Sequence, residues 1–207
     1  KDRVLYPKKP GSFYHLSKVH DSANIEFACR IWGIKCTDLN QGFVYGLTTN
    51  EIALDPENLA TSFHYDAIFG TIVNRFITQI ACGRDMTVYG KGNQKRGFLN
   101  LIDTIKCVSI ACLNPPKNGE FRVFNQFTEF CSLNDIADKI KNYASINKIN
   151  AKISHINNPR VEEEDHYYNP KNTSLISLGL KPTFLDNTEI DKIYKKVKNN
   201  QNQINLD

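Results

Sequence analysis

The chain has 207 residues, of which 41% are hydrophobic and 23% are charged, which is enough apolar surface for a folded core. Mean hydropathy is −0.43, and no apolar run approaches the ~20 residues that a membrane-spanning helix needs, so we expect no membrane insertion. The net charge of +4 could come from lysines near the C-terminus alone, which favours a solvated helix face over a nucleic-acid-binding groove.

The first predicted element is a helix over residues 13–32, with Ser12 as its N-cap and Gly33 at its end. Apolar residues recur at helical spacing, which predicts one buried face. This face consists of Val19, Ala23, Phe27 and Ile31.

The rest of the chain alternates between short apolar stretches and amphipathic ones. The pattern predicts strands at 34–39, 86–89, 97–99, 120–124 and 152–156, and helices at 66–83, 101–113 and 132–147. Residues 48–64 are polar and rich in turn residues, so we expect a surface excursion over the site. An acidic, aromatic loop at 158–170 precedes two further short helices. Such alternation indicates α/β architecture, with strands that are few and late in the chain.

Tyr14 and Lys18 are the most informative residues, because side chains four apart in a helix lie on one face. A nearby ammonium favours the phenolate form of a tyrosine. A phenolate can accept a proton from a sugar hydroxyl while a hydride leaves for a nicotinamide. The pair therefore predicts a redox enzyme that acts on a hydroxyl group.

The same spacing occurs twice more. In Tyr167/Lys171, Pro170 disfavours a regular helical turn. Tyr194/Lys198 lies on a polar, lysine-rich terminal segment with no sign of a pocket. Only Tyr14/Lys18 lies on a long amphipathic stretch that follows a helix-start signal, so this copy is the predicted site.

Six cysteines are present, and none forms a Cys-x-x-Cys pair or has a histidine at metal-ligand spacing. Most lie among apolar neighbours, where a free cysteine behaves as a small buried hydrophobic residue. The sequence therefore predicts no metal site. It favours a reducing compartment, either the cytoplasm of a bacterium or the stroma of a plastid.

A nicotinamide enzyme of this kind also needs a glycine-rich phosphate-binding turn between a strand and a helix. Residues 90–94 contain two glycines but lack a third, and they lie too far downstream. We therefore expect roughly 100–150 residues of a dinucleotide-binding domain to precede Lys1, which makes the chain a fragment.

Four motifs occur in a fixed order: the Tyr-x-x-x-Lys helix, Asn-Gln-Gly followed by Val-Tyr-Gly, Val-Tyr-Gly-Lys-Gly-x-Gln-x-Arg, and a late Pro-Arg before an acidic loop. In this order they resemble the extended short-chain dehydrogenase/reductases of the NAD-dependent epimerase/dehydratase family, which act on nucleotide sugars. The resemblance is strongest to the branch that makes the sulfolipid head group. It rests on residues 6–21, 37–42, 121–129, 158–162 and 166–169, and it thins toward the C-terminus.

The resemblance implies an α/β fold in two parts. Residues 1–85 would be the C-terminal portion of a Rossmann-type NAD-binding domain that lacks its N-terminal glycine-rich half. Residues 86–207 would mainly form a smaller α/β substrate domain for a nucleotide sugar, with some segments returning to the first domain. It also implies a homodimer, in which residues 13–32 and 66–82 pack against their copies.

The implied reaction uses UDP-glucose, sulfite and NAD. The sugar is oxidised at C4, which acidifies the proton at C5; water is then eliminated across C5–C6, sulfite adds to C6, and C4 is reduced again. Tyr14 would be the base at C4, Lys18 its partner and a ribose ligand, and His15 would serve the elimination or the sulfite addition. Val44 resembles a position that meets the nicotinamide, and core packing would explain it equally well.

Two arginines resemble the family's diphosphate-binding residues. A guanidinium suits a diphosphate because its planar fork makes two parallel charge-assisted hydrogen bonds. Arg96 and Arg160 should therefore converge on one cleft, along which Tyr14 and Lys18 also lie. The acidic run that follows Arg160 could offset the repulsion between the two guanidinium groups.

Four further residues resemble substrate-binding positions. Gln94 would join the arginines at the uracil and ribose, and Gln41 would lie between them and the catalytic helix. Thr71 and Arg75 would reach the uridine side. The structural alternatives are a turn cap for Gln41 and a surface ion pair for Arg75.

Two other functions are open. One is a nucleotide-sugar 4-epimerase or 4,6-dehydratase, which would share the Tyr14/Lys18 pair and both arginines. His15 and residues 125–129 favour the sulfolipid branch over it. The other is a non-catalytic binding module that kept the fold. The intact Tyr14/Lys18 pair argues against it, although a chain without the glycine-rich half should be inactive alone.

Overall fold

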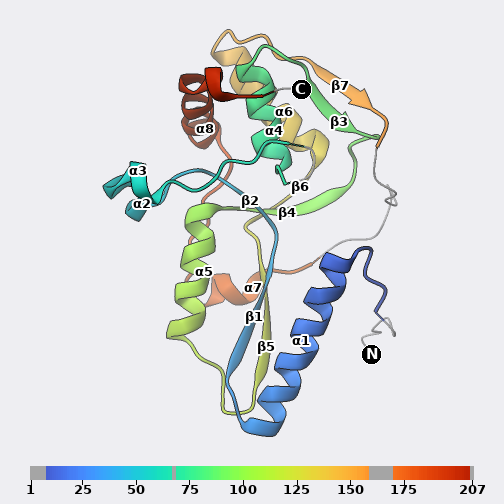
Figure 1. The fold of residues 1–207 in the computed structure, drawn as a ribbon, viewed down its shortest axis with the longest axis vertical. Coiled ribbons are helices and arrows are strands. Elements are labelled where there is room, and N and C mark those ends of the chain that lie inside the picture. Colours follow the sequence, from blue (N-terminus) through green and yellow to red (C-terminus); the bar gives the residue numbers. More distant parts are fainter. Residues whose placement is uncertain (1–7, 67–68, 159–169, 206–207) are drawn as a thin grey trace.

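The computed structural model describes residues 8–66, 69–158 and 170–205. Helices and strands alternate along the chain, and Figure 1 shows them in an elongated arrangement. The elements are α1 (Phe13–Trp32), β1 (Cys36–Gln41), β2 (Phe43–Tyr45), α2 (Asn50–Leu54), α3 (Pro56–Leu59), α4 (Ile72–Ala81), β3 (Met86–Tyr89), β4 (Lys95–Asn100), α5 (Leu101–Leu113), β5 (Phe121–Gln126), β6 (Glu129–Ser132), α6 (Leu133–Ile146), β7 (Ile153–Ile156), α7 (Thr173–Ser177), α8 (Asn187–Asn199) and the 3₁₀ helix η1 (Gln201–Gln203).

The lower half of the molecule in Figure 1 is built on the parallel pair of β1 and β5. Side chains alternate along a strand, so the two faces of this pair have different neighbours. On one face, Leu39 and Phe124 form a small core with Cys107 of α5 and Leu175 of α7. On the other face, Asp38 meets α1, where the Ser22 hydroxyl donates a hydrogen bond of 2.7 Å to its carboxylate.

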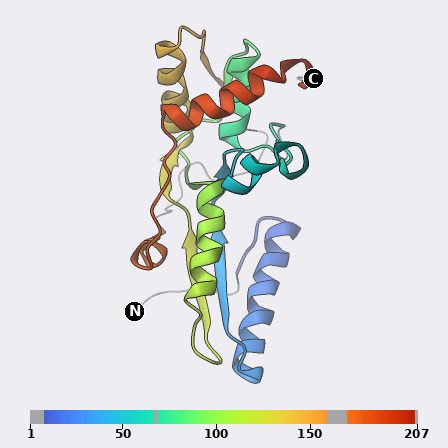
Figure 2. The ribbon, with the colours of Figure 1, turned by 90° about the vertical axis from the view of Figure 1, so that its left-hand side faces the viewer.

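The upper half holds the main core. Helices α4, α6 and α8 pack around the parallel pair of β3 and β7, as Figures 1 and 2 show. The three-stranded sheet of β2, β4 and β6 lies between the halves, with β2 parallel and β6 antiparallel to β4. Buried Glu129 of β6 accepts hydrogen bonds from Tyr45 Oη (3.1 Å) and Leu185 N (2.7 Å), and these join β2 and the segment before α8 to β6.

The predicted bounds of the first helix are confirmed. Ser12 accepts a hydrogen bond from the His15 amide and forms the N-cap. Gly33 ends the helix with a φ of 67°, a conformation that glycine adopts without strain, and its amide donates to Cys29 O.

The predicted buried face of this helix is wrong. Phe27 is 48% exposed, Ile31 is 53% exposed and Ala23 is also exposed, whereas Cys29 is fully buried. Among the described residues, the helix lies on only two strands, which cover too little of its surface to bury a complete face.

Other elements differ from prediction in length. The expected helix at 66–83 is shorter, since Asp66 Oδ1 accepts from the Phe69 amide in a turn and α4 begins at Ile72. Residues 48–64 contain two short helices, capped by Thr49 and Asp55, and they pack near α8 rather than over the Tyr14 helix. Strands β2 and β6, with three and four residues, are too short for a periodicity argument. Helix α8 has 13 residues and is not short.

Within the described ranges, every helix is either too short or too polar to cross a lipid bilayer. The same residues hold no cluster of three or more His, Cys, Asp or Glu side chains placed to bind a metal ion. All six cysteines are free thiols.

Candidate active site

Tyr14 and Lys18 lie on an exposed face of α1, where Tyr14 is 67% accessible to solvent. The Lys18 ammonium lies 5.6 Å from the centroid of the Tyr14 ring, a cation–π contact, and 3.5 Å from Asp21 Oδ2. The His15 ring meets the Tyr14 ring edge-on at 5.5 Å, and a hydrogen bond of 2.8 Å joins its Nδ1 to Ser12 Oγ. The first two turns of α1 thus hold all three predicted catalytic side chains together.

A basic cleft of about 1280 Å³ runs along this helix. Its basic groups come from separate parts of the chain: Lys18 and His15 from α1, and Arg96 from β4. Lys8 and Lys9 add to them at the entry to the helix. The acidic group in the lining is Asp38, which Ser22 already engages. The cleft therefore favours an anionic ligand.

A second, smaller cavity brings together Arg75, Gln94 and Arg96. The Arg75 guanidinium stacks on the Tyr89 ring at 4.1 Å and donates to Thr87 O at 3.0 Å. The volume of about 80 Å³ holds a few water molecules rather than a nucleobase, so a larger ligand requires the walls to move apart.

Two polar atoms at this cavity are buried and have no hydrogen-bond partner among the described residues. Gln94 is 6% exposed; its Nε2 donates to Tyr89 O at 3.3 Å, but its Oε1 accepts nothing. Thr71 Oγ1 is also buried without a hydrogen-bond partner among the described residues, and the neighbouring residues Gly70 and Ile72 line the cavity. An unsatisfied buried polar atom costs about 1–3 kcal/mol, so a ligand that supplies donors here is favoured.

Arg96 lines both cavities, which are therefore joined at its side chain. The backbone is tightly packed next to Arg96, since a Cβ on Gly42, between β1 and β2, would lie only 2.5 Å from Gly97 O of β4. The cleft lined by His15 and Lys18 and the cavity lined by Arg75 and Gln94 thus meet at Arg96 of β4.

Five predicted residues are not among the lining residues of the two cavities: Tyr14, Gln41, Val44, Thr71 and Arg160. Tyr14 lies on α1 beside the basic cleft without lining it, and Thr71 lies between two residues that line the smaller cavity. Arg160 lies outside the described residues, although Asn158, which precedes it closely, lines the smaller cavity. Val44 is half-buried in β2, paired with Leu99. Gln41 is exposed at the end of β1, and alternation along the strand places it on the α5 side.

Asn40 is a site residue that sequence reasoning missed. This residue lines the basic cleft together with Asp38, on the α1 side of β1. The signal that could have found it is the period of two along a strand: if Leu39 enters a core, its neighbours face the opposite way.

The third Tyr-x-x-x-Lys copy is structural. Lys198 Nζ donates to Ala81 O at 3.0 Å, and the Tyr194 ring packs on Tyr143 at 5.8 Å between ring centroids. The expectation that this terminal segment has no pocket is wrong, because another face of α8 lines a cavity of about 650 Å³. In the second copy, Tyr167 lies outside the described residues.

No family model matches the chain. The chain is 53% identical over 192 residues to the chloroplastic UDP-sulfoquinovose synthase of Spinacia oleracea, which covers 93% of this chain and 40% of that protein. It is 44% identical over 182 residues to the UDP-sulfoquinovose synthase of Sulfolobus acidocaldarius, which covers 88% of this chain and 46% of that protein. The chain thus spans less than half the length of these relatives.

Solved structures share the fold. The UDP-glucuronic acid 4-epimerase of Bacillus cereus, in complex with UDP-glucuronic acid and NAD, matches 96% of this chain and 57% of its own with a TM-score of 0.66 and 20% identity. The UDP-glucose 4-epimerase of Thermus thermophilus, in complex with NAD, matches 95% and 58% with a TM-score of 0.66 and 17% identity. The predicted α/β fold is confirmed, and these epimerase structures share it.

Proposed function

We propose that this chain, a homologue of the UDP-sulfoquinovose synthases, carries the catalytic pair Tyr14/Lys18 and the nucleotide-sugar binding site of such an enzyme. The whole enzyme would convert UDP-glucose and sulfite to UDP-sulfoquinovose by transient oxidation at C4, dehydration across C5–C6 and addition of sulfite, a reaction formally grouped with carbon–sulfur bond hydrolases. One observation carries the proposal: Arg96 joins the basic cleft beside the Tyr14 helix to the cavity of Gln94 and Arg75.

Bound NAD would supply the hydride acceptor for oxidation at C4 and the hydride donor for the later reduction. The residues present fit one end of a dinucleotide, because the basic cleft offers the Lys18 ammonium to ribose and phosphate oxygens. Tyr14, Lys18 and Val44 would hold it. No glycine-rich phosphate turn between a strand and a helix occurs in the described residues, so its pyrophosphate would be bound by chain outside them.

The catalytic roles follow from the side chains of α1. Tyr14 would take the proton from the C4 hydroxyl, and the positive charge of Lys18 would stabilise the resulting phenolate. His15 is held by Ser12 and would exchange a proton during the elimination or the sulfite addition. The cationic lining of the cleft would attract the sulfite anion.

The substrate would lie across Arg96, with its diphosphate on the guanidinium and its uridine toward Gln94 and Arg75. The unpartnered Gln94 Oε1 and Thr71 Oγ1 supply hydrogen-bonding groups for this end. Arg160 would be the second diphosphate ligand and Gln41 a sugar ligand; both stay predictions, as do the two domains at 1–85 and 86–207. Asn40 joins the list because it lines the cleft.

The test is UDP binding by isothermal titration calorimetry in the full-length protein. Arg96→Gln removes charge-assisted hydrogen bonds and should raise the Kd for UDP by about 10- to 100-fold. Arg84→Gln is the matched control, because Arg84 is an exposed arginine that lines neither cavity. An unchanged Kd in Arg96→Gln would reject this nucleotide site.

Product analysis separates the alternatives. A UDP-sulfoquinovose synthase consumes sulfite and yields a sulfonated sugar nucleotide. A 4-epimerase would yield the C4 epimer without sulfite, and a non-catalytic module would bind UDP-glucose and release it unchanged.

We expect the 207-residue chain alone to be inactive, the whole enzyme to be a homodimer, and its compartment to be bacterial cytoplasm or plastid stroma; the spinach relative is named as chloroplastic.

A further inference from the structure

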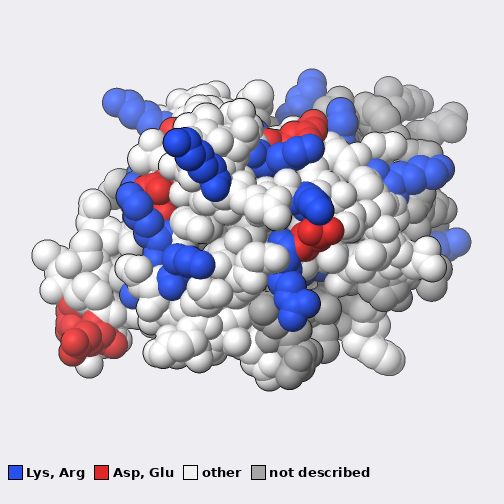
Figure 3. Space-filling model, turned by 90° about the horizontal axis from the view of Figure 1, so that it is seen from above, with Lys and Arg blue, Asp and Glu red and all other residues white. Residues whose placement is uncertain are grey.

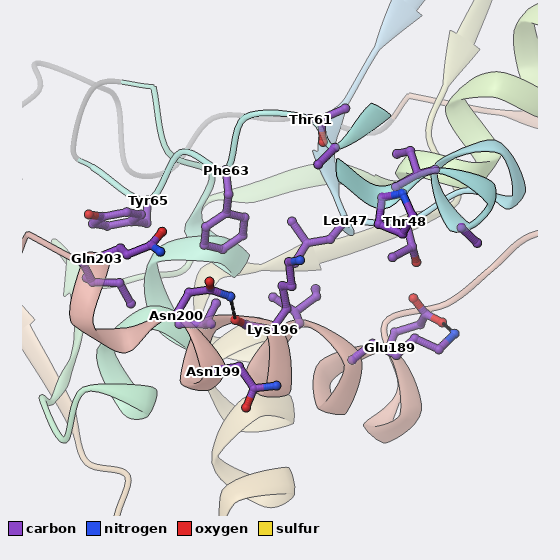
Figure 4. A pocket seen from close by; sticks show the side chains of 18 residues that line it. Leu47, Thr48, Thr61, Phe63, Tyr65, Glu189, Lys196, Asn199, Asn200 and Gln203 are labelled. Carbon is purple, nitrogen blue, oxygen red and sulfur yellow. Dashed lines mark hydrogen bonds and ion pairs between the residues drawn. The ribbon is translucent and has the colours of Figure 1, made fainter. Parts of the chain in front are cut away.

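The cavity of about 650 Å³ at α8 is separate from the candidate active site, since it shares no lining residue with the two cavities that meet at Arg96. One wall is a face of α8 and η1, and the other is the segment 47–65 that contains α2 and α3. Figure 4 shows side chains from both walls converging on the space between them. Its volume falls within the ~300–1,000 Å³ typical of small-molecule sites.

The lining is mainly apolar and continuous with the protein core. Ile193 and Val197 of α8 belong to the main core, and Leu47, Phe63 and Ile204 pack against that core while lining the cavity. Burying such an apolar surface lowers the free energy by about 25 cal/mol for each Å² removed from water. The cavity therefore favours a ligand with a substantial apolar body.

Two of the three charged side chains at the cavity, and two of the polar ones, already have partners within the protein. Glu189 accepts from Asn100 Nδ2 at 3.0 Å and forms an ion pair with Lys192. Asn200 Nδ2 donates to Lys196 O at 2.8 Å, and Tyr65 Oη accepts from the Asn205 amide at 2.9 Å. These groups have little need of a polar ligand.

The Lys196 ammonium is the remaining charged group of the lining. No carboxylate among the described residues pairs with it, and Figure 4 shows its side chain extending from α8 across the cavity toward Leu47. The charged side chains of the lining are Glu189, Lys192 and Lys196, a net charge of +1. Figure 3 shows more lysine and arginine than acidic side chains on the upper face of the molecule.

We propose that this cavity binds a free fatty carboxylate, with the aliphatic chain against Ile193, Val197 and Phe63 and the carboxylate on Lys196. An apolar ligand would suffice for the apolar walls, but an anionic end group also complements the Lys196 ammonium, which no carboxylate of the described residues pairs. This site is independent of the proposed synthase activity, and its test does not depend on turnover.

Laurate is the probe, measured by titration calorimetry below its aggregation concentration, with dodecanol and dodecylammonium as uncharged and cationic controls. We expect laurate to bind with a 1:1 stoichiometry and at least about fivefold more tightly than dodecanol. Dodecylammonium should bind more weakly than either.

Two variants address the two halves of the ligand. Lys196→Gln should weaken laurate about fivefold and leave dodecanol within about twofold, since only the charge is lost. Lys195→Gln is the matched control, because this neighbour pairs with Asp191 at 2.7 Å and does not line the cavity. Ala60→Phe, at an exposed lining position, should fill space and weaken both ligands.

Equal affinity for laurate in Lys196→Gln and wild type would overturn the proposal. Unchanged laurate affinity in the Ala60→Phe variant would also overturn it. Two further results would reassign the cavity. Binding to phosphatidylglycerol vesicles without binding of laurate would indicate a membrane surface, and self-association abolished by Ala60→Phe would indicate a second copy. Circular dichroism melts of each variant establish that the fold is kept.

Discussion

Tyr14 and Lys18 reach their shared position without help from distant parts of the chain. Their spacing on one helix places the ammonium over the ring, 5.6 Å from its centroid, rather than at the hydroxyl. The Tyr14 side chain is largely open to solvent, and Ser12 holds the adjacent His15. A base, its cationic partner and a proton-exchanging group are therefore preassembled by local geometry.

Tyr14→Phe should reduce turnover of UDP-glucose by about 100-fold or more in the full-length protein, since general acid–base catalysis contributes about 10²- to 10⁴-fold. Affinity for UDP-glucose should change little, because only one hydroxyl is lost. Steady-state kinetics and calorimetry measure the two effects.

Tyr194→Phe provides the matched control for this experiment. Tyr194 belongs to another Tyr-x-x-x-Lys copy, where Lys198 donates to a main-chain carbonyl. Turnover should stay near the wild-type value in this variant. Near-normal turnover of Tyr14→Phe would show that another group is the base.

At the scale of elements, the helix ends show how a few side chains define boundaries. The capping box of α6 is complete: Ser132 accepts from the Asp135 amide at 3.0 Å, and Asp135 accepts from the Ser132 amide at 2.8 Å. The hydrogen bond from the Ser132 backbone lowers the pKa of Asp135 below its ordinary value, because it favours the ionised carboxylate.

Asp135→Asn should lower the free energy of unfolding by about 0.5 kcal/mol at neutral pH, the size of a carboxylate effect at a helix N-terminus. Because the folded-state pKa is lowered, this stabilisation is fully present above the ordinary aspartate pKa of ~3.9 and disappears as the pH falls through the folded value. Urea unfolding at several pH values measures the difference between the variant and wild type.

Asp138→Asn is the control for the same helix, since Asp138 is exposed and lies outside the capping box. Its unfolding free energy should match that of wild type at neutral pH. A difference between Asp135→Asn and wild type that persists unchanged at a pH of about 2 would mean that the effect is not due to the carboxylate charge.

At the scale of the whole molecule, α1 exposes several large apolar side chains. Phe13, Phe27, Ile31 and Trp32 are each about half exposed or more. An exposed apolar surface of this kind is typical of a protein–protein interface. The family resemblance predicts that the same helix of a second subunit packs against it.

Phe27→Glu should therefore raise the dimer dissociation constant of the full-length protein by about 30-fold, the effect of losing one interface residue worth ~2 kcal/mol. Analytical ultracentrifugation over a concentration series measures it. Leu113→Glu is the control, because Leu113 is also exposed but ends α5. A wild-type protein that stays monomeric at all concentrations would contradict the predicted homodimer.

The sequence alone determined the features that depend on neighbours in the chain. Ser12 and Gly33 bound α1, the helix at 101–113 begins and ends as predicted, and strand 86–89 is found at its predicted residues. The Tyr14/Lys18 contact is also set by neighbours in the chain. Caps, periodicity and four-residue spacing act over a single turn or strand, so no distant contact is needed to specify them.

Only the tertiary structure decided what depends on residues far apart in the chain. His15 and Arg96 line the same cleft, and Asn40 rather than Gln41 joins them there. Both facts, and the exposure of one face of α1, follow from how the strands pair and which faces they cover. The cavity at α8 likewise exists only because residues 47–65 pack against a helix more than 120 residues later. Periodicity identifies an apolar face, but the neighbours that bury it come from elsewhere in the fold.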